Sequence, residues 1–516
     1  MSADPPTSLL DIVVRRTDHD PTTPLLLVLS ADGASETVLA YGDVLTRASQ
    51  LAAVLAEAGV GPGDRVGCYL SNSPSWVVAS LAVWLRGAAV GAVGTLLPGP
   101  EASALFELAE VKVVVAVDGA PDLEPGPTVV RVGEDGSVGS ATEGSLDVRE
   151  VELPDTASLA VVIFTSGTTG KPKGITHTHG DVVAAARRVA AGYARTSDYR
   201  PGPAPAHLPP GVVFNPFGHM AGYSRLAFRM WIGRPTVILP RFTVPAAKAL
   251  LSRYPMDTLQ LTPTMIHMLA TSDEELDLGG VKYVTSGTAP LSIDTRERFE
   301  QRFGVPVMQA YGMTEVGAVA QERYDDVVAG RRGPGSVGRL AAGVEVRIRH
   351  LDEDRPAGEG EILVRTDEAS TEFLGGAAVP VDADGWFASG DVGRMDDGIL
   401  YITGRVQEKI IVGGFNVYPA EVEDAVRRSV LVADAVVVGL ADDRLGERPV
   451  AGIVWSGAPD EPALLEDLRG LLAAYKVPRE TFTIDSVPLT PRDKVDRIRA
   501  AELADQALGP QRGASS

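Results

Sequence analysis

Short apolar runs alternate with amphipathic segments along most of the chain. Residues 38–41 and 66–70 are apolar runs of strand length, and residues 42–58 between them carry apolar side chains at helical spacing. Gly59 follows as a helix stop signal. The same alternation continues through a helix over 74–85, a strand over 88–92, a helix over 100–108 and a strand over 112–117. This pattern predicts an α/β fold with a mostly parallel sheet covered by helices on both faces.

The pattern changes after about residue 335, where the apolar segments become shorter. Strand signals cluster over residues 344–349, 360–365 and 399–403, which predicts a small β-subdomain. Beyond Arg405 the pattern is that of a small α+β unit that ends near Leu508. We therefore expect an N-terminal domain over residues 1–404, with two βα-layered subdomains and the small β-subdomain, and a C-terminal domain over residues 405–516.

Composition excludes several classes of protein. A chain of 516 residues is too long for one hydrophobic core, and its net charge of −21 argues against nucleic acid or an anionic membrane as a general partner. The one cysteine, Cys68, allows neither an internal disulfide nor a cysteine-based zinc site. No uncharged run reaches the roughly 20 apolar residues of a membrane span, and the first residues do not resemble a signal peptide. We therefore expect a cytoplasmic protein.

The segment richest in candidate chemistry follows the apolar run 159–163. It combines glycines, hydroxyl side chains and lysines, which supply backbone N–H groups, donors and positive charge to a phosphate. Its spacing is not that of a Walker loop, because only Thr168 and Thr169 separate Gly167 from Gly170. A plain linker is disfavoured because a strand precedes it directly. The residues predicted to bind phosphate are Thr165, Ser166, Gly167, Thr168, Thr169, Gly170, Lys171 and Lys173.

This loop and several later motifs, in the same order, resemble the adenylate-forming superfamily, most closely its acyl-CoA synthetases. The superfamily also contains aryl-CoA ligases, luciferases and peptide-synthetase adenylation domains. The resemblance spans roughly Tyr41 to Arg497. It implies a ligase that uses ATP, Mg²⁺ and coenzyme A, forms an acyl-AMP intermediate, and has a mobile C-terminal domain.

The resemblance implies a nucleotide site drawn from four segments. Tyr311 would stack on adenine, Thr314 would bind the α-phosphate and Glu315 would bind Mg²⁺. Asp391 would hold the ribose hydroxyls, with Arg405 on ribose or phosphate. The remaining residues implied at this site are Gly287, Thr288, Ala289, Pro290, Gly312 and Met313. The family commonly has Ala where this chain has Thr288.

The segment over residues 212–223 resembles the family's acyl pocket. His219 would line that pocket and separate it from ATP, although a structural histidine at a strand end is an alternative. Small and apolar residues suggest room for a sizeable hydrophobic acid. An amino acid substrate is disfavoured because residues 214–223 contain no Asp. The candidate pocket residues are His219, Met220, Ala221, Gly222, Tyr223, Gly287, Gly312 and Met313.

The C-terminal motifs resemble the part of the family that moves between two half-reactions. Lys494 lies at the position of the adenylation lysine, with Asp493 where the family usually has Gly. Glu408 lies at the hinge, where the family usually has Asp. The coenzyme A candidates are Gly413, Gly414, Phe415 and Lys476.

Two other functions remain open at this point. The enzyme could transfer its acyl group to an acyl carrier protein instead of CoA, or the chain could be a non-catalytic acyl-AMP-binding homologue, given Asp493 beside Lys494. Fatty, aryl and polycyclic, terpenoid-like acids all suit the predicted pocket. The sequence leaves the oligomeric state open, with a homodimer as one option.

Overall fold

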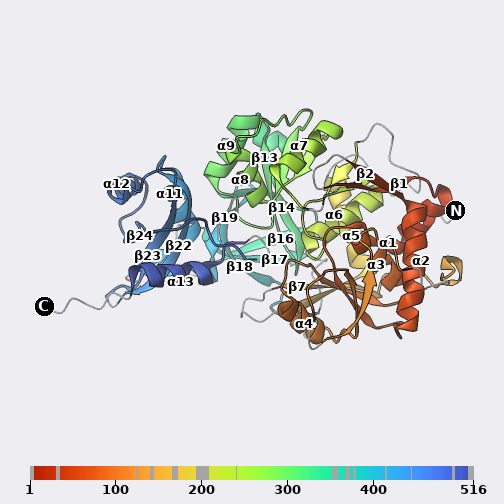
Figure 1. The fold of residues 1–516 in the computed structure, drawn as a ribbon. Helices are drawn as coiled ribbons and strands as arrows, with labels where there is room; N and C mark the ends of the chain where they lie inside the picture. Colours follow the sequence, from red (N-terminus) through yellow and green to blue (C-terminus); the bar gives the residue numbers. More distant parts are fainter. Residues whose placement is uncertain are drawn as a thin grey trace. The chain divides into compact units, whose positions relative to one another are not determined.

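The chain divides into two units in a computed structural model, drawn in Figure 1. The first contains Met1–Thr285, Met313–Gly317 and Glu368–Val379, and the second contains Ser286–Gly312, Ala318–Asp367 and Pro380–Ser516. The predicted domain boundary after residue 404 falls inside the second unit and stays a prediction. The structure describes residues 5–30, 35–123, 126–139, 145–165, 173–192, 209–239, 241–350, 358–366, 372–375, 379–412, 415–442, 444–490 and 494–509.

A six-stranded sheet forms one half of the first unit. Its order is β6 (Thr128–Val132), β5 (Val113–Val117), β3 (Arg65–Tyr69), β4 (Ala89–Val93), β7 (Leu159–Thr165) and β8 (Lys173–Thr178). Neighbours from β6 to β7 are parallel, and β8 is antiparallel to β7. The central strands are buried on both faces, as expected for a helix-covered parallel sheet.

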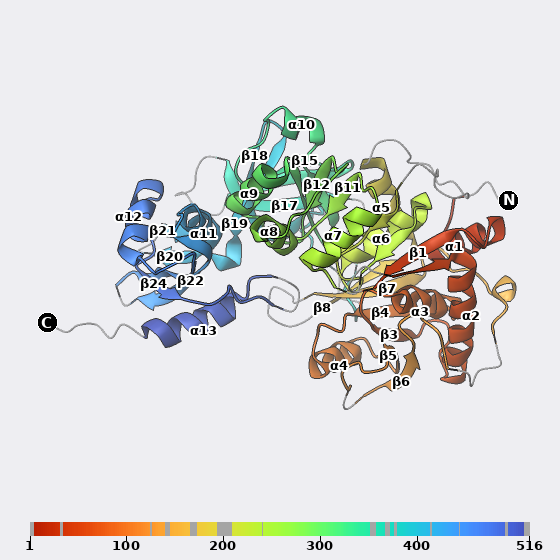
Figure 2. The same cartoon turned by 45° about the horizontal axis from the view of Figure 1, so that its top comes forward.

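Helices cover both faces of this sheet, as the sequence pattern predicts. Helix α3 (Pro74–Leu85) packs on one face, with α2 (Tyr41–Glu57) against it, and α4 (Gly99–Leu108) packs on the other (Figure 2). Helix α3 is buried along its whole length. Helix α5 (His179–Gly192) follows β8.

A four-stranded sheet forms a second layer of the first unit. Its order is β2 (Glu36–Ala40), β1 (Pro24–Leu29), β10 (Thr236–Ile238) and β9 (Gly211–Val212). Helix α1 (Leu9–His19) packs near α6 (Met220–Ile232). Strand β11 (Thr258–Gln260) pairs in parallel with β12 (Tyr283–Ser286), and α7 (Val244–Arg253) and α8 (Pro263–Thr271) precede and follow β11 in sequence.

Arg16 of α1 closes the C-terminal end of α6. Its side chain is 2% exposed and donates from Nε to Met230 O at 3.2 Å and from Nη2 to Trp231 O at 2.9 Å. Gly233 ends α6 with φ +70°, and a Cβ there would lie 2.3 Å from Arg16 Nη1. Arg16 therefore adds side-chain donors to two helix-end carbonyls, of which Met230 O also accepts from Gly233 N at 3.2 Å.

An antiparallel sheet dominates the first part of the second unit. Its order is β13 (Val307–Met313), β14 (Gly317–Gln321), β15 (Ser336–Leu340), β19 (Ile399–Arg405), β18 (Phe387–Asp396), β17 (Glu359–Thr366) and β16 (Val344–Arg349). Helices α9 (Ile293–Phe303) and α10 (Tyr324–Val328) belong to the same part. The strands β15 to β19 match the β-subdomain expected after residue 335.

The C-terminal part is an α+β unit, as expected. Its sheet has the order β21 (Phe415–Val417), β20 (Ile410–Val412), β23 (Gly446–Trp455) and β22 (Val432–Asp442), and β24 (Glu480–Thr483) pairs with β23. Helices α11 (Pro419–Arg427) and α12 (Glu461–Leu471) pack on one face, and α13 (Arg497–Leu508) packs on the other (Figure 1). Within the described residues, no helix is both long enough and apolar enough to span a membrane.

Candidate active site

The predicted phosphate loop connects two antiparallel strands. Strand β7 ends at Thr165 and β8 begins at Lys173, and these two residues are paired across the ladder. The Lys173 ammonium lies 4.9 Å from the centre of the Phe373 ring. Thr165 Oγ1 is buried and has no hydrogen-bond partner among the described residues. The predicted phosphate ligands Ser166, Gly167, Thr168, Thr169, Gly170 and Lys171 lie outside the described residues.

The predicted acyl-pocket residues lie at the start of α6. His219 is the N-cap, and its Nδ1 accepts a hydrogen bond from Ala221 N at 3.2 Å. The sequence pattern predicts a helix over 224–232 only, and this is wrong at the N-terminus, because α6 begins at Met220. The difference follows from the imidazole cap, which satisfies a first-turn N–H group.

The turn before α6 is held by Asn72, which belongs to none of the sequence motifs. Asn72 Nδ2 donates to Asn215 O at 2.9 Å, and Phe217 N donates to Asn72 Oδ1 at 2.7 Å. A side-chain amide that donates and accepts in this way substitutes for a backbone partner. No local signal reveals it, because Asn72 and Phe217 are 145 residues apart.

Packing explains two of the residues at the start of α6. A Cβ on Gly222 would lie 2.2 Å from Pro216 O and 2.5 Å from Asn215 O, so this glycine allows close backbone approach. Tyr223 is 2% exposed and belongs to the main hydrophobic core of the first unit. Their predicted roles in an acyl pocket stay predictions.

The loop predicted to face adenine has an unusual backbone. Thr288 adopts φ +74°, a left-handed conformation that is strained for a β-branched side chain. A Cβ on Gly287 would lie 2.8 Å from Ala310 O. Ala289 is partly buried, while Thr288 and Pro290 are exposed. Such strain is typical of functional loops.

Asp391 connects three segments that the resemblance implies at the nucleotide. Asp391 is 5% exposed. Its Oδ2 accepts from Tyr311 Oη at 2.6 Å, and its Oδ1 accepts from Arg405 Nε at 2.9 Å. Burial, and then the negative charge of Asp391, raises the pKa of the Tyr311 hydroxyl well above its ordinary value, so it remains a donor.

The residues implied at the α-phosphate and the metal follow β13. Thr314 is 8% exposed, and Gly312 is exposed. Met313 and Glu315 are partly buried. No group of three His, Cys, Asp or Glu side chains suited to a metal occurs in the part of the chain that the structure describes.

The predicted lysine loop is closed by a short antiparallel contact. Leu489 bridges to Val495, and Thr490 N donates to Lys494 O at 2.7 Å. Lys494 is exposed, and Asp493 lies outside the described residues. The loop therefore presents Lys494 to solvent.

Part of the predicted coenzyme A site is described. Gly413 and Gly414 lie outside the described residues. Phe415 is 49% exposed and stacks on Tyr475 with ring centres 4.7 Å apart. Lys476 Nζ donates to both carboxylate oxygens of Glu421, at 2.6 and 2.7 Å.

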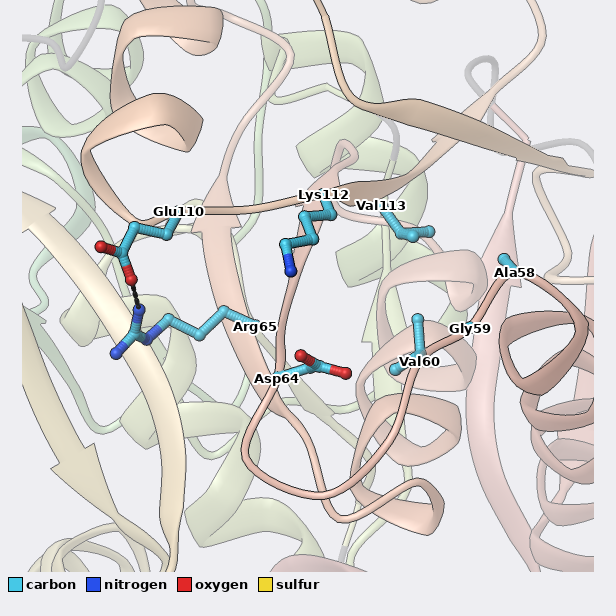
Figure 3. A pocket seen from close by; sticks show the side chains of 8 residues that line it. All are labelled: Ala58, Gly59, Val60, Asp64, Arg65, Glu110, Lys112 and Val113. Atoms are coloured by element: carbon cyan, nitrogen blue, oxygen red, sulfur yellow. Dashed lines mark hydrogen bonds and ion pairs between the residues drawn. The ribbon is translucent and has the colours of Figure 1, made fainter.

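One pocket lies at the end of the six-stranded sheet where β3 and β5 begin (Figure 3). It opens at the amino ends of β3 and β5, whereas the loop follows the carboxyl end of β7. Arg65 Nη1 and Glu110 Oε2 pair there at 3.1 Å. The lining residues are Ala58, Gly59, Val60, Asp64, Arg65, Glu110, Lys112 and Val113. It is not part of the predicted site.

Two family matches cover most of the chain. A family described as AMP-binding enzyme matches residues 20–373, and one described as AMP-binding enzyme C-terminal domain matches residues 421–494. The chain belongs to the AMP-binding enzyme family.

Individual relatives of this family member match nearly end to end. A Rhodococcus jostii (strain RHA1) protein named 3-[(3aS,4S,7aS)-7a-methyl-1,5-dioxo-octahydro-1H-inden-4-yl]propanoyl:CoA ligase is 32% identical over 534 residues, which cover 93% of this chain and 98% of that protein. A long-chain-fatty-acid–CoA ligase of Mycobacterium tuberculosis (strain CDC 1551 / Oshkosh), FadD13, is 28% identical over 474 residues, covering 89% of this chain and 91% of that protein.

A solved structure shows the same fold. The crystal structure of ATP-bound MatB from Rhodopseudomonas palustris matches with a TM-score of 0.82 and 25% identity, covering 97% of this chain and 100% of that one. The matches confirm the predicted superfamily, the α/β fold and the enzyme class, an AMP-forming acid–thiol ligase. The roles of individual site residues stay predictions.

Proposed function

We propose that this AMP-binding enzyme is an acyl-CoA synthetase that activates a hydrophobic carboxylic acid. The main support is the match to the Rhodococcus jostii CoA ligase, which covers 93% of this chain and 98% of that protein and so includes the C-terminal domain. An enzyme with two half-reactions needs a mobile C-terminal domain, because Lys494 must approach the nucleotide in the first half-reaction and leave it before the second.

The first half-reaction joins the acid to AMP. A carboxylate oxygen attacks the α-phosphorus of ATP, and the bond to pyrophosphate breaks. Negative charge develops on the phosphoryl oxygens, so donors that point at them stabilise the transition state. The Lys494 ammonium and the Thr314 hydroxyl supply such donors in this proposal, together with the phosphate loop.

The second half-reaction transfers the acyl group to sulfur. The CoA thiol, as it loses its proton, attacks the acyl carbonyl carbon, and the bond to AMP breaks. AMP is a good leaving group, whereas the oxygen of the unactivated carboxylate is a poor one. The segment Gly413–Phe415 and Lys476 are our candidates for the CoA side.

The described residues fit a nucleotide and its metal. Thr165 carries a buried hydroxyl without a partner among the described residues, at the edge of the phosphate loop. Asp391 presents a carboxylate, the acceptor that two ribose hydroxyls need. Glu315 offers a partly buried carboxylate, and Mg²⁺ typically combines one or two carboxylates with substrate phosphates. Bound there, Mg²⁺ would neutralise phosphate charge.

The acid we propose is bulky and apolar. Met220, Tyr223 and Met313 are the apolar candidates for its pocket, and His219 would lie between the acid and ATP. The relatives named above act, by their names, on a fused-ring propanoate and on long-chain fatty acids. A fused-ring or aryl-alkanoic acid is therefore our first choice, and fatty acids are the second. We place the reaction in the cytoplasm, which supplies both ATP and CoA.

The test is a screen of acids for CoA-dependent AMP release, with each product identified by mass. A panel of fused-ring propanoic, aryl and long-chain fatty acids should give an acyl-CoA with at least one member. Pyrophosphate release with no thioester until a carrier protein is added would favour the carrier-loading alternative. No ATP-dependent product with any acid would refute the proposal and favour a nucleotide-binding homologue.

A further inference from the structure

Two ion pairs lie on either side of the predicted hinge. Arg405, the last residue of β19, is opposite Asp391 in the ladder with β18, and its Nε donates to that carboxylate at 2.9 Å. Glu408, three residues later, accepts at Oε2 from Arg497 Nε at 2.9 Å. Only Val406 and Gln407 lie between the two anchored residues, in a 3₁₀ turn over Val406–Glu408.

Arg497 is itself fixed to the C-terminal sheet and helix α11. Its Nη1 donates to Glu423 Oε1 at 2.5 Å and to Val437 O at 3.0 Å, and its Nη2 donates to Glu423 Oε2 at 3.3 Å. Glu423 is 4% exposed. Burial raises the pKa of the Glu423 carboxyl, but the charges of Arg497 and Arg427 outweigh burial and lower the pKa overall. The guanidinium therefore connects a buried, charged acceptor to Glu408.

The same arginine borders the Lys494 loop. Arg497 is the first residue of α13, and Asp496 N donates to Pro488 O at 2.8 Å, which closes the base of the loop. Glu408 and the base of the Lys494 loop are thus both attached to the C-terminal sheet and helix α11. A planar guanidinium with several donors suits this bridging role, whereas a lysine ammonium could not span both acids in the same geometry.

We propose that Arg497 is a positioning residue that binds Glu408 to the C-terminal domain and so confines the hinge to Val406 and Gln407. This inference rests on the proposed function, since only an enzyme with two half-reactions needs the domain to reorient. It also gives a role to Glu408 itself, whose side chain is one methylene longer than the Asp that the family usually has there.

The test is amide hydrogen exchange, measured by mass spectrometry on the full-length chain without substrate. In Glu408→Ala, amides of residues 408–411 should exchange about fivefold faster, the size expected for a partly exposed ion pair. Helix α11 and strand β22 should exchange as in the wild type. Arg497→Lys should reproduce the local effect, and the double variant should add little to either single variant.

Glu502→Gln is the matched control. Glu502 lies on the same helix and accepts from Arg499 Nη1 at 2.7 Å, and its loss should leave exchange at 408–411 unchanged. Unchanged exchange at 408–411 in Glu408→Ala would overturn the proposal. Equal acceleration throughout α11 and β22 would also overturn it, because that result indicates general destabilisation.

A second readout addresses the reaction. With an acid identified in the screen, two rates are measured: thioester formation from preformed acyl-AMP, and ATP–pyrophosphate exchange. The ratio of the first rate to the second should change at least threefold in Glu408→Ala and should not change in Glu502→Gln. An unchanged ratio in Glu408→Ala would contradict the proposal.

The hinge proposal and the proposed function can be refuted independently. A chain that makes acyl-CoA but shows no local exchange effect refutes only the hinge proposal. A chain that makes no acyl-AMP but shows the effect refutes only the enzymatic function.

Discussion

Tyr311→Phe removes one of the two side chains that, among the described residues, donate to the Asp391 carboxylate, and it leaves the aromatic ring in place. The hydroxyl donates to Asp391 Oδ2 at 2.6 Å, and Asp391 is 5% exposed, so water cannot easily replace the hydroxyl. An ionised carboxylate has about four acceptor positions. In the proposed site it therefore binds Tyr311, Arg405 and a ribose diol together, and the tyrosine orients it for the diol.

The expected effect is on nucleotide affinity. Hydrogen bonds to charged groups contribute about 1.5–3 kcal/mol, and Arg405 continues to hold the other oxygen in the variant. We therefore expect the KM for ATP to rise about tenfold, equivalent to about 1.4 kcal/mol. The value of kcat should change little, because the hydroxyl does not touch the reacting phosphorus in the proposed site. The measurement is steady-state AMP release over a range of ATP concentrations.

Tyr254→Phe is the control for loss of a tyrosine hydroxyl. Tyr254 Oη is buried without a hydrogen-bond partner among the described residues, so its removal should leave both the KM and the stability unchanged or slightly improved. An unchanged or lower KM in Tyr311→Phe would refute the reasoning. A lower KM would mean that the tyrosine competes with ribose for Asp391.

Three further predictions concern other parts of the chain. Lys494→Ala should slow acyl-AMP formation by about 100- to 1,000-fold with no change in melting temperature, and a normal rate would exclude this lysine from the chemistry. Gly222→Ala places a Cβ 2.2 Å from Pro216 O, so urea unfolding should show a loss of about 1–3 kcal/mol. Burial lowers the pKa of His177 and of His179 from 6.5 to about 4. Each histidine should therefore cost about 3 kcal/mol of stability as pH falls from 6.5 to 4, and His179→Phe should lose less over that range than the wild type.

Local signals predict the elements well. Ser73 followed by Pro74 marks a helix start, and α3 runs over Pro74–Leu85 as expected. Ser292 likewise precedes α9 and accepts a hydrogen bond from Thr295 N at 3.2 Å. These signals succeed because a cap and its helix are neighbours in sequence.

The contacts that organise the candidate site are not local and could not be predicted this way. Tyr311 and Asp391 are 80 residues apart, and Glu408 and Arg497 are 89 residues apart. The resemblance assigns ligands to Tyr311 and Asp391 and the hinge to Glu408, but it says nothing of the bonds between side chains. The left-handed backbone of Thr288 is another case, because a β-branched residue gives no sequence signal for that conformation.

If the start of α6 lines the acid pocket as proposed, the attachment of Arg16 to the end of α6 limits how this enzyme can adapt to other acids. With Met230 O, Trp231 O and Gly233 fixed against the first helix of the chain, α6 cannot slide along its axis to enlarge or shrink a neighbouring space. A change in acid size would have to come from exchanging side chains in its opening turn. Libraries aimed at residues 219–223 should therefore alter acid preference more readily than libraries aimed at residues 228–232.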